Sequence, residues 1–354
     1  MPKTISSSHP EWRSERFLAT LASRDDVVLV SHVNPDPDAL ASMLGVQALI
    51  LARQPGKKVT LTRDGLIARA ENQSMVRLLD IPVVPVEEAL IGPNTAVVMV
   101  DTQPYTGRRA SEATQPVAVI DHHDTGGSLD GVAYVDLRPE LGATSTIITG
   151  YLLEQHVPVG PRLATALLYG IESEITGYPR EAGPADDGAL VWLYPRADKD
   201  QIAQIRNPRL PHSYFAAFQQ ALANSFQYGD AIVSWCGSVT QPDLIAEIAD
   251  FFIRFDEVRW VLCIGLWGDL MKLSVRTSEL GLNAGEVLRM AVDGLGTAGG
   301  HDKRAGGSVP MTDPSPKAID SLRKTLCHRF LSRIGADEDH GRRLLGFMPV
   351  VPLP

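Results

Sequence analysis

Cysteine is scarce in this sequence of 354 residues, which contains three widely spaced ones, Cys236, Cys263 and Cys327. Because they form no Cys-x-x-Cys pair, we expect no disulfide framework, and a reducing compartment fits. Long apolar runs are missing too, since no stretch reaches the about 20 apolar residues that a membrane-spanning helix needs. Residues 1–15 are polar and lack the apolar core of a secretory signal. We therefore expect a cytoplasmic protein without membrane attachment.

The sequence also lacks an excess of positive charge. Its 33 Lys and Arg residues stand against 42 Asp and Glu residues, which gives a formal net charge of −9. An acidic chain does not bind long nucleic acids through bulk electrostatics, so long duplexes are excluded as partners. A nucleic-acid substrate would have to be short and held by a local basic pocket or by metal ions. Some of the acidic residues are then candidates for metal ligands.

The first half of the chain alternates between predicted strands and predicted helices. Short runs rich in β-branched residues predict strands at 27–30, 59–62, 96–100, 117–120 and 132–135, and helical patterns cover 11–22, 40–51, 144–155 and 162–171. This alternation indicates βαβ units. We therefore predict an α/β fold with a mostly parallel sheet and helices on both faces.

The second half predicts a smaller α/β domain with a mixed sheet. Its expected elements are a helix at 214–223, a strand at 231–235, a helix at 244–252, a hairpin of 258–266 with 270–275, a helix at 284–292, a glycine-rich loop at 294–307 and a helix at 316–333. We place the first domain at 18–205, a linker region at 206–226 and the second domain at 227–340. The polar, proline-containing stretch 194–212 is interpreted as the approach to the linker.

Polar residues directly follow three predicted strands of the first domain. The groups are Ser31-His32, Asp101 and Asp121-His122-His123. In open α/β sheets, ligands bind at the carboxyl ends of the strands, so these side chains should meet at one edge of the sheet. Each group alone has a plain structural interpretation, as a helix cap or as turn residues. Their shared position favours a metal site.

The segment after the first predicted strand carries three potential ligands, His32, Asp36 and Asp38. Pro35 and Pro37 argue against a helix here, so we expect a stiff extended loop. In an extended segment, Asp36 and Asp38 point to the same side. Imidazole and carboxylate groups on one rigid loop suit cations such as Mn²⁺ or Mg²⁺.

Together these motifs resemble those of the DHH family of phosphoesterases, which is named for the motif seen here as Asp121-His122-His123. The family's first motif, His-x-x-x-Asp-x-Asp, is matched from His32 to Asp38, and its second, an Asp after a strand, by Asp101. The fourth motif, Gly-Ile-x-x-Asp, corresponds to residues 170–174, which places Glu174 at the acidic position with one methylene more. Glu172 is the alternative.

The resemblance implies two divalent cations, with Mn²⁺ as the expected ion and Mg²⁺ as the alternative. It assigns one cation to His32, Asp36 and Asp101, and the other to Asp38, Asp101, His122 and Glu174. Asp101 would then bridge the two. His123 would be the catalytic residue that contacts the scissile phosphate or assists the leaving group, and Asp121 would support the loop.

The second half resembles the family's companion domain, called DHHA1. The family's glycine signature Gly-Gly-Gly-His corresponds to Gly-Thr-Ala-Gly-Gly-His at 296–301. The usual Ala-Ala-Gly reads Arg-Ala-Gly at 304–306, and Ser-x-Arg-Ser is similar to Ser-Val-Arg-Thr-Ser at 274–278. The resemblance implies that substrate is bound by Arg276, Gly299, Gly300, His301 and Arg304. Glycines let backbone N–H groups approach a phosphate, and guanidinium groups suit its charge.

The resemblance as a whole implies an enzyme of the nanoRNase type, similar to bifunctional oligoribonucleases and pAp phosphatases. Such an enzyme releases mononucleotides from short oligonucleotides or dinucleotides. One alternative is a hydrolase of cyclic or linear di-adenylate. Another is a non-catalytic nucleotide-binding regulatory protein, which the unusual Glu174 and Arg304 keep open. The exact substrate, the cleavage polarity and a possible homodimer are left open.

Overall fold

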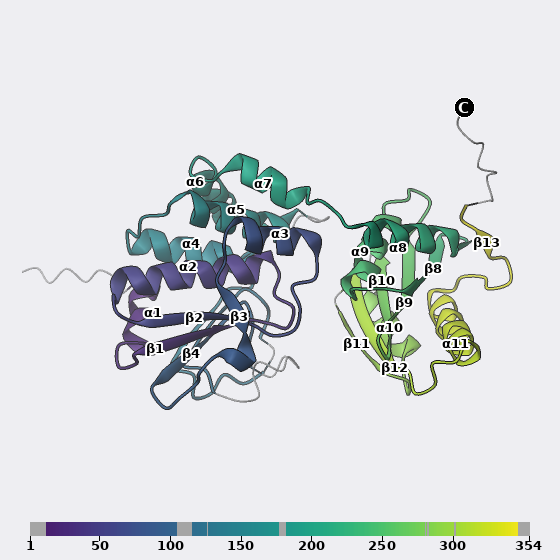
Figure 1. The fold of residues 1–354 in the computed structure, drawn as a ribbon, viewed down its shortest axis with the longest axis horizontal. Coiled ribbons are helices and arrows are strands. Elements are labelled where there is room, and N and C mark those ends of the chain that lie inside the picture. The colour runs from purple at the N-terminus through teal and green to yellow at the C-terminus, as the bar shows by residue number, and fades with distance from the viewer. Residues whose placement is uncertain are drawn as a thin grey trace, which may run out of the picture. The chain divides into compact units, whose positions relative to one another are not determined.

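The computed structural model describes residues 12–104, 115–125, 127–176, 182–279, 281, 283–300 and 302–345. The chain divides into two compact units, Met1–Pro208 and Arg209–Pro354. Within the described residues, none of the helices combines the length and the apolar character needed to cross a membrane. Each unit is built around its own sheet (Figure 1).

The first unit contains a parallel six-stranded sheet in the order β3-β2-β1-β4-β5-β6. Its strands are β1 (Asp26–Val30), β2 (Lys58–Arg63), β3 (Val83–Pro85), β4 (Thr95–Val100), β5 (Ala118–Asp121) and β6 (Tyr134–Leu137). The strand order reverses between β1 and β4, which are direct neighbours. Such a switch point opens a crevice at the carboxyl ends of the two strands. The first two polar groups predicted from the sequence follow these strands.

Helices pack on one face of this sheet and form the large core of the unit (Figure 1). They are α1 (Arg13–Thr20), α2 (Pro37–Arg53), α3 (Ala70–Leu78), α4 (Thr144–Glu154), α5 (Pro161–Ile175), α6 (Pro184–Leu193) and α7 (Lys199–Arg206). Alternate residues of β1 divide between the faces, because Val27 and Leu29 join the large core while Val28 and Val30 form a small apolar cluster with Val97. Ala89, just after the short 3₁₀ helix η1 (Val86–Glu88), packs against that cluster.

Helix α2 begins at Pro37, so the predicted extended loop through Asp36 and Asp38 is wrong. Asp36 is the N-cap and its carboxylate accepts a hydrogen bond from the Ala39 N–H at 3.0 Å. A proline is well tolerated in the first turn, where its missing N–H has no partner to lose. Asp38 therefore points from the first turn of a helix, and it is fully buried.

The second unit contains a mixed seven-stranded sheet in the order β11-β12-β10-β9-β8-β7-β13, in which only β8 and β9 pair in parallel. Its strands are β7 (Ser225–Tyr228), β8 (Ala231–Ser238), β9 (Trp260–Trp267), β10 (Leu270–Thr277), β11 (Thr297–Gly300), β12 (Arg304–Pro310) and β13 (Arg342–Arg343). Helices α8 (His212–Ala223) and α9 (Asp243–Phe252) cover one face, and α10 (Ala284–Ala291) and α11 (Pro316–Ile334) cover the other.

The α/β class, the parallel sheet of the first unit and the mixed sheet of the second are confirmed. The predicted cover of both faces of the first sheet is not found in the described residues, because their α-helices pack on one face. The predicted glycine-rich loop at 294–307 is wrong, because most of it forms the antiparallel strands β11 and β12 at the edge of the second sheet. The elements not predicted from the sequence are β3, η1, α3, α6, α7, β7 and β13. Helix α7 lies in the stretch that we interpreted as the approach to a linker, and Asp198 caps it through the N–H groups of residues 200 and 201.

Candidate metal centre

The carboxyl ends of three neighbouring strands bring the predicted ligands together. His32 follows β1, Asp101 follows β4, and Asp121 ends β5 immediately before His122 and His123. Two groups of side chains in the described residues have ligand atoms within 4.8 Å of one another: His32, Asp36 and Asp101, and Asp101, His122 and His123. The structure thus brings together residues that lie up to 91 positions apart (from 32 to 123).

Asp101 lies at the centre of both groups. Its Oδ2 is 3.4 Å from Nε2 of His32, and its Oδ1 is 3.6 Å from Nε2 of His122. The residue has a φ of +59°, in the left-handed region, while its N–H still donates to the Ile120 carbonyl at 2.9 Å. Asp reaches this region more readily than most residues, but the conformation is held by its surroundings. The turn aims the carboxylate into the crevice.

Both imidazoles present the same nitrogen to Asp101. Nδ1 of His32 lies 3.0 Å from the carbonyl oxygen of Val33, and Nδ1 of His122 lies 3.2 Å from that of Leu141. A carbonyl can only accept, so each Nδ1 carries a proton, and Nε2 is the nitrogen at which a cation would replace a proton. Backbone carbonyls that fix a tautomer in this way are typical partners of metal-binding histidines.

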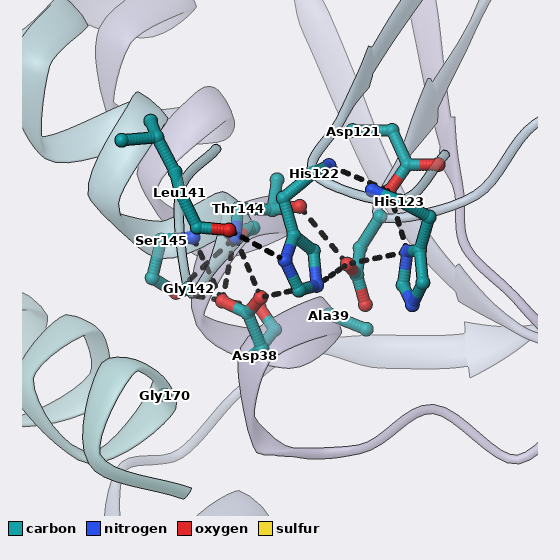
Figure 2. A network of polar contacts seen from close by, with 12 residues as sticks. Asp38, Ala39, Asp121, His122, His123, Leu141, Gly142, Thr144, Ser145 and Gly170 are labelled. Carbon is teal, nitrogen blue, oxygen red and sulfur yellow. Dashed lines mark hydrogen bonds and ion pairs between the residues drawn. The ribbon is translucent and has the colours of Figure 1, made fainter. Parts of the chain in front are cut away.

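Asp38 is held at the start of α4, as Figure 2 shows. The N–H groups of Thr144 and Ser145 donate to Oδ2 and Oδ1 of Asp38, each at 2.7 Å. A helix N-terminus stabilises a negative charge. Oδ2 also lies 4.0 Å from Nε2 of His122, so this oxygen borders the cluster.

Asp121 organises the loop rather than facing the crevice. Its Oδ1 accepts hydrogen bonds from the His122 N–H at 2.8 Å and from Nδ1 of His123 at 2.8 Å (Figure 2). Its Oδ2 accepts from Nε2 of Gln103 at 2.8 Å. The same amide group of Gln103 also donates to the carbonyls of His123 and Asp124, at 3.3 and 3.1 Å. Gln103 therefore fixes the loop.

The pKa shifts report crowded, buried charges. Burial and the neighbouring Asp101 carboxylate raise the pKa of Asp38 to about 7. Burial and the carboxylates of Asp36, Asp38 and Asp101 hold the pKa of Glu174 well above its ordinary value. Burial would lower the pKa of His122, but Asp101, Asp38 and Glu174 outweigh it and raise that pKa to about 9. The cluster thus favours added positive charge.

His32 and Asp36 form an ion pair within the cluster, with His32 Nε2 3.3 Å from Asp36 Oδ2. Burial opposes both charges, yet the Asp36 and Asp101 carboxylates raise the pKa of His32 well above its ordinary value. The His32 imidazole and the Ala39 N–H likewise outweigh burial and hold the pKa of Asp36 far below the usual range. A cation at this position would take over the role of the proton.

The two acidic candidates on α5 point to different surroundings. The Glu172 carboxylate forms an ion pair with the guanidinium of Arg206 in α7. The pKa of Glu174 is instead raised by burial and by the nearby carboxylates of Asp36, Asp38 and Asp101. Residues two apart on a helix lie on opposite sides, so only one of them can face the crevice. The charges that act on Glu174 favour it as the ligand, and Glu172 lies in an ion pair.

The donor set fits divalent cations. The imidazoles of His32 and His122 and the carboxylates of Asp36 and Asp101 belong to the two close groups. Asp38 lies 4.0 Å from His122, and the Glu174 carboxylate helps to raise the pKa of His122. Mixed nitrogen and oxygen donors suit Mn²⁺, and Mg²⁺ accepts the carboxylates. Without cations, this many buried acids in one place would repel one another. The individual ligand roles stay predictions.

The predicted substrate-binding residues of the second unit divide between two settings. Gly299 pairs with Gly306 and Arg304 pairs with Arg276, which puts these four on one face of the sheet. A Cβ on Gly299 or Gly306 would meet no atom within 4 Å, so that face is open. A Cβ on Gly300 would lie 2.3 Å from the Arg304 carbonyl oxygen, so this glycine serves strand packing.

Arg276 is mostly buried although it borders this open face. Its Nε donates to Oδ1 of Asp250 at 2.5 Å, and its Nη1 donates to the Ser274 hydroxyl and the Val275 carbonyl, both at 2.9 Å. The guanidinium is therefore held in place, while Arg304 is exposed. His301 lies outside the described residues.

Sequence reasoning missed Gln103, Thr144 and Ser145. Gln103 follows Asp101 by two residues, so its place after a strand end was a usable signal. Thr144 also contributes its hydroxyl, which donates to Asp101 Oδ1 at 2.9 Å. The helix start at 144 was predicted, but its approach to Asp38 depends on how α4 packs against α2.

Comparison with known proteins supports these motifs. Residues 26–171 match the DHH family, N-terminal domain. The chain is 31% identical over 287 residues to an uncharacterized protein of Methanocaldococcus jannaschii, a match covering 80% of this chain and 58% of the relative. It is 27% identical over 157 residues to a probable bifunctional oligoribonuclease and PAP phosphatase of Streptococcus mutans, covering 44% of this chain and 47% of the relative. The chain thus spans about half the length of these relatives.

A cyclic-di-AMP phosphodiesterase of Geobacillus thermodenitrificans is 27% identical over 187 residues, which covers 49% of this chain and 28% of that protein. Two solved structures share the fold over most of the chain. An exopolyphosphatase-related protein of Bacteroides fragilis has a TM-score of 0.69 at 16% identity, with 91% of this chain and 97% of the other covered. RecJ of Thermus thermophilus in complex with Mn²⁺ has a TM-score of 0.53 at 15% identity, with 92% and 55% covered.

The matched range contains the three strand-end groups described above and ends before Glu174. We identify residues 26–171 as a domain of the DHH family, N-terminal domain type.

Proposed function

We propose that this chain is a two-metal-dependent phosphoesterase that hydrolyses short oligonucleotides or dinucleotides to mononucleotides, with pAp as a further candidate substrate. The observation that carries the proposal is the position of Asp101, whose two carboxylate oxygens each lie within 3.6 Å of a separate imidazole Nε2. A carboxylate placed in this way suits a bridge between two ions.

In this proposal, His32, Asp36 and Asp101 hold one divalent cation, and Asp38, Asp101, His122 and Glu174 hold the other. Paired cations supply a nucleophile at neutral pH and neutralise the phosphate charge. The backbone carbonyls of Val33 and Leu141 keep the two imidazoles in the tautomer that this task needs.

His123 has a separate task in this proposal. Its Nδ1 is bonded to Asp121, so its Nε2 remains for a phosphate oxygen or for the leaving group. The Asp121 hydrogen bond, which outweighs partial burial, raises the pKa of His123 above its ordinary value. The imidazole is therefore able to hold a proton near neutral pH and to donate it as a bond to oxygen breaks.

The substrate class is supported by the open sheet face in the second unit and by the two named relatives. Arg276 and Arg304 border the open glycines, and guanidinium groups suit phosphate oxygens. Similarity to an oligoribonuclease and PAP phosphatase favours short RNA or pAp. Similarity to a cyclic-di-AMP phosphodiesterase favours a second candidate, cyclic or linear di-adenylate. The net charge of −9 argues against long nucleic acids in both cases.

A panel of hydrolysis assays in Mn²⁺ tests the proposal. The substrates are RNA of two to five nucleotides, pAp, linear and cyclic di-adenylate, and pyrophosphate, and 5′- and 3′-labelled RNA reports the polarity. We expect metal-dependent release of mononucleotides from at least one nucleotide substrate. Nucleotide binding without turnover of any of them would favour a regulatory protein, and turnover of pyrophosphate alone would contradict the substrate class.

A further inference from the structure

One peptide group links a buried acid to His122. The carbonyl of Leu141 accepts from Nδ1 of His122 at 3.2 Å, and the N–H of Gly142, on the other side of the same peptide bond, donates to Oδ2 of Asp186 at 3.0 Å. Figure 2 shows Leu141 and Gly142 beside the imidazole. The three groups form a continuous chain from carboxylate to peptide to imidazole.

Asp186 belongs to α6, the helix that follows the one carrying Glu174, and it is fully buried. Its Oδ2 also accepts from the Gly183 N–H at 2.8 Å, and its Oδ1 accepts from the Thr146 hydroxyl at 2.6 Å. Within the part of the chain that the structure describes, these three neutral donors are its hydrogen-bond partners. Its negative charge is therefore available to polarise the groups that donate to it.

We propose that Asp186 is a positioning residue that acts on the second cation site through the Leu141–Gly142 peptide. A carboxylate that accepts from a peptide N–H draws charge onto the carbonyl oxygen of the same peptide, because hydrogen bonds in a chain polarise one another. The Leu141 carbonyl then binds the Nδ1 proton of His122 more strongly, which fixes the ring and makes Nε2 a better donor. Carboxylates bonded directly to metal-binding histidines have this effect, and here one peptide group lies between.

The same segment leads into α4. Two residues after Gly142, the N–H groups of Thr144 and Ser145 hold the Asp38 carboxylate. Asp186 also grips α4 through Thr146, in the first turn of that helix. One buried acid thus fixes the segment that orients two of the residues assigned to one cation, His122 and Asp38. The inference rests on the metal centre of the proposed function but concerns binding, not turnover.

The test compares Asp186→Asn with Thr146→Val. The first variant keeps the shape but removes the charge that polarises the peptide. The second removes the hydrogen bond from Thr146 to the same carboxylate and leaves those from Gly142 and Gly183. Calorimetric titration of metal-free protein with Mn²⁺ should give two sites in the wild type. We expect Asp186→Asn to bind one Mn²⁺ about 10–100-fold more weakly, the size found for partners of metal ligands. Thr146→Val should stay within about threefold of wild type at both sites, because it leaves the Gly142 contact intact.

A spectroscopic signature separates positioning from general stability. In Zn²⁺-loaded protein, the Nδ1 proton of His122 should resonate downfield and move upfield in Asp186→Asn as its hydrogen bond weakens. Asp186→Glu is the second variant, and it should weaken one Mn²⁺ site as well because its longer side chain displaces the carboxylate. Unchanged Mn²⁺ affinity in whichever of these variants folds, or equal losses in Thr146→Val, would overturn the inference.

Failure of the proposed function gives a different result. A wild type that binds two Mn²⁺ ions but hydrolyses no substrate removes the proposed activity, and the affinity comparison still decides the role of Asp186. A wild type that binds no Mn²⁺ overturns both.

Discussion

His123 and Asp121 form a hydrogen-bonded pair, with Nδ1 of one 2.8 Å from Oδ1 of the other. This hydrogen bond orients the His123 ring and occupies Nδ1, so Nε2 is the nitrogen left to contact a substrate. His123 is also the most exposed of the three histidines at the site, at 41% for its side chain, against 10% for His32 and 12% for His122. Exposure and orientation agree with a residue that meets substrate.

We therefore expect His123→Ala to lower kcat by about 10²–10⁴-fold, the range for loss of a general acid, while KM changes little. Calorimetry should still find two Mn²⁺ sites, since His32 and His122 keep their ligand nitrogens. A His123→Ala variant that binds one Mn²⁺ fewer would instead identify His123 as a ligand. The alternative is tested because Nδ1 of His123 lies 3.8 Å from Oδ1 of Asp101.

Asp101→Asn should lower turnover by at least about 100-fold, because the amide cannot bridge two cations. Asn tolerates the left-handed conformation at this position, so the circular dichroism spectrum should be that of the wild type. Mn²⁺ should raise the melting temperature of the wild type, since a ligand that binds only the native state stabilises it. The variant should lack this rise. Wild-type turnover in Asp101→Asn would remove the bridging role.

Glu174 and Glu172 offer a matched comparison on one helix. Glu174→Gln should weaken Mn²⁺ binding and lower turnover by at least about tenfold, because it removes a negative charge that interacts with the other carboxylates of the site. Glu172→Gln should leave both unchanged and cost at most about 1 kcal/mol, since it breaks only the partly exposed pair with Arg206. Activity assays and calorimetry on both variants decide, and the reverse pattern would make Glu172 the ligand.

The sequence predicted the sheet edge well because strand-end positions depend on local patterns. The runs before His32, Asp101 and Asp121 are apolar and β-branched, so each strand end was readable, and the parallel order then brought them together. The prediction was wrong at Pro37. A proline is found both in loops and in the first turn of a helix, so the local sequence did not show that a helix begins here.

Other features depended on packing between distant segments. Asp38 and the start of α4 are 106 residues apart, and nothing in either segment alone indicates their contact. The same holds for Asp186 and Gly142, which lie 44 residues apart. The glycine-rich segment became strands because β10 offers it a partner, and glycine has too little intrinsic preference to show this. Tertiary contacts thus decided what local patterns could not.

Asp136 predicts how stability depends on pH, away from the metal centre. This buried carboxylate accepts hydrogen bonds from Nε and Nη2 of Arg138 at 3.0 and 2.7 Å and from the Tyr151 hydroxyl at 2.5 Å, and it pairs with Arg13. Burial would raise the pKa of Asp136, but Arg138 and Tyr151 outweigh burial and lower it. The charged form is therefore favoured in the folded state.

A carboxylate with a lowered folded pKa adds stability above its unfolded pKa of about 3.9, and this gain is lost as the pH falls through the folded value. Asp136→Asn should thus lower the free energy of unfolding by about 1–3 kcal/mol at pH 7, the usual cost of losing such hydrogen bonds. The difference from wild type should stay constant from pH 7 to about 5 and shrink below about pH 4. Urea denaturation across that range measures it, with the exposed Asp130→Asn as a control expected within about 0.5 kcal/mol. A difference that grew on acidification would mean that burial outweighs Arg138 and Tyr151, and that Asp136 is held neutral rather than charged.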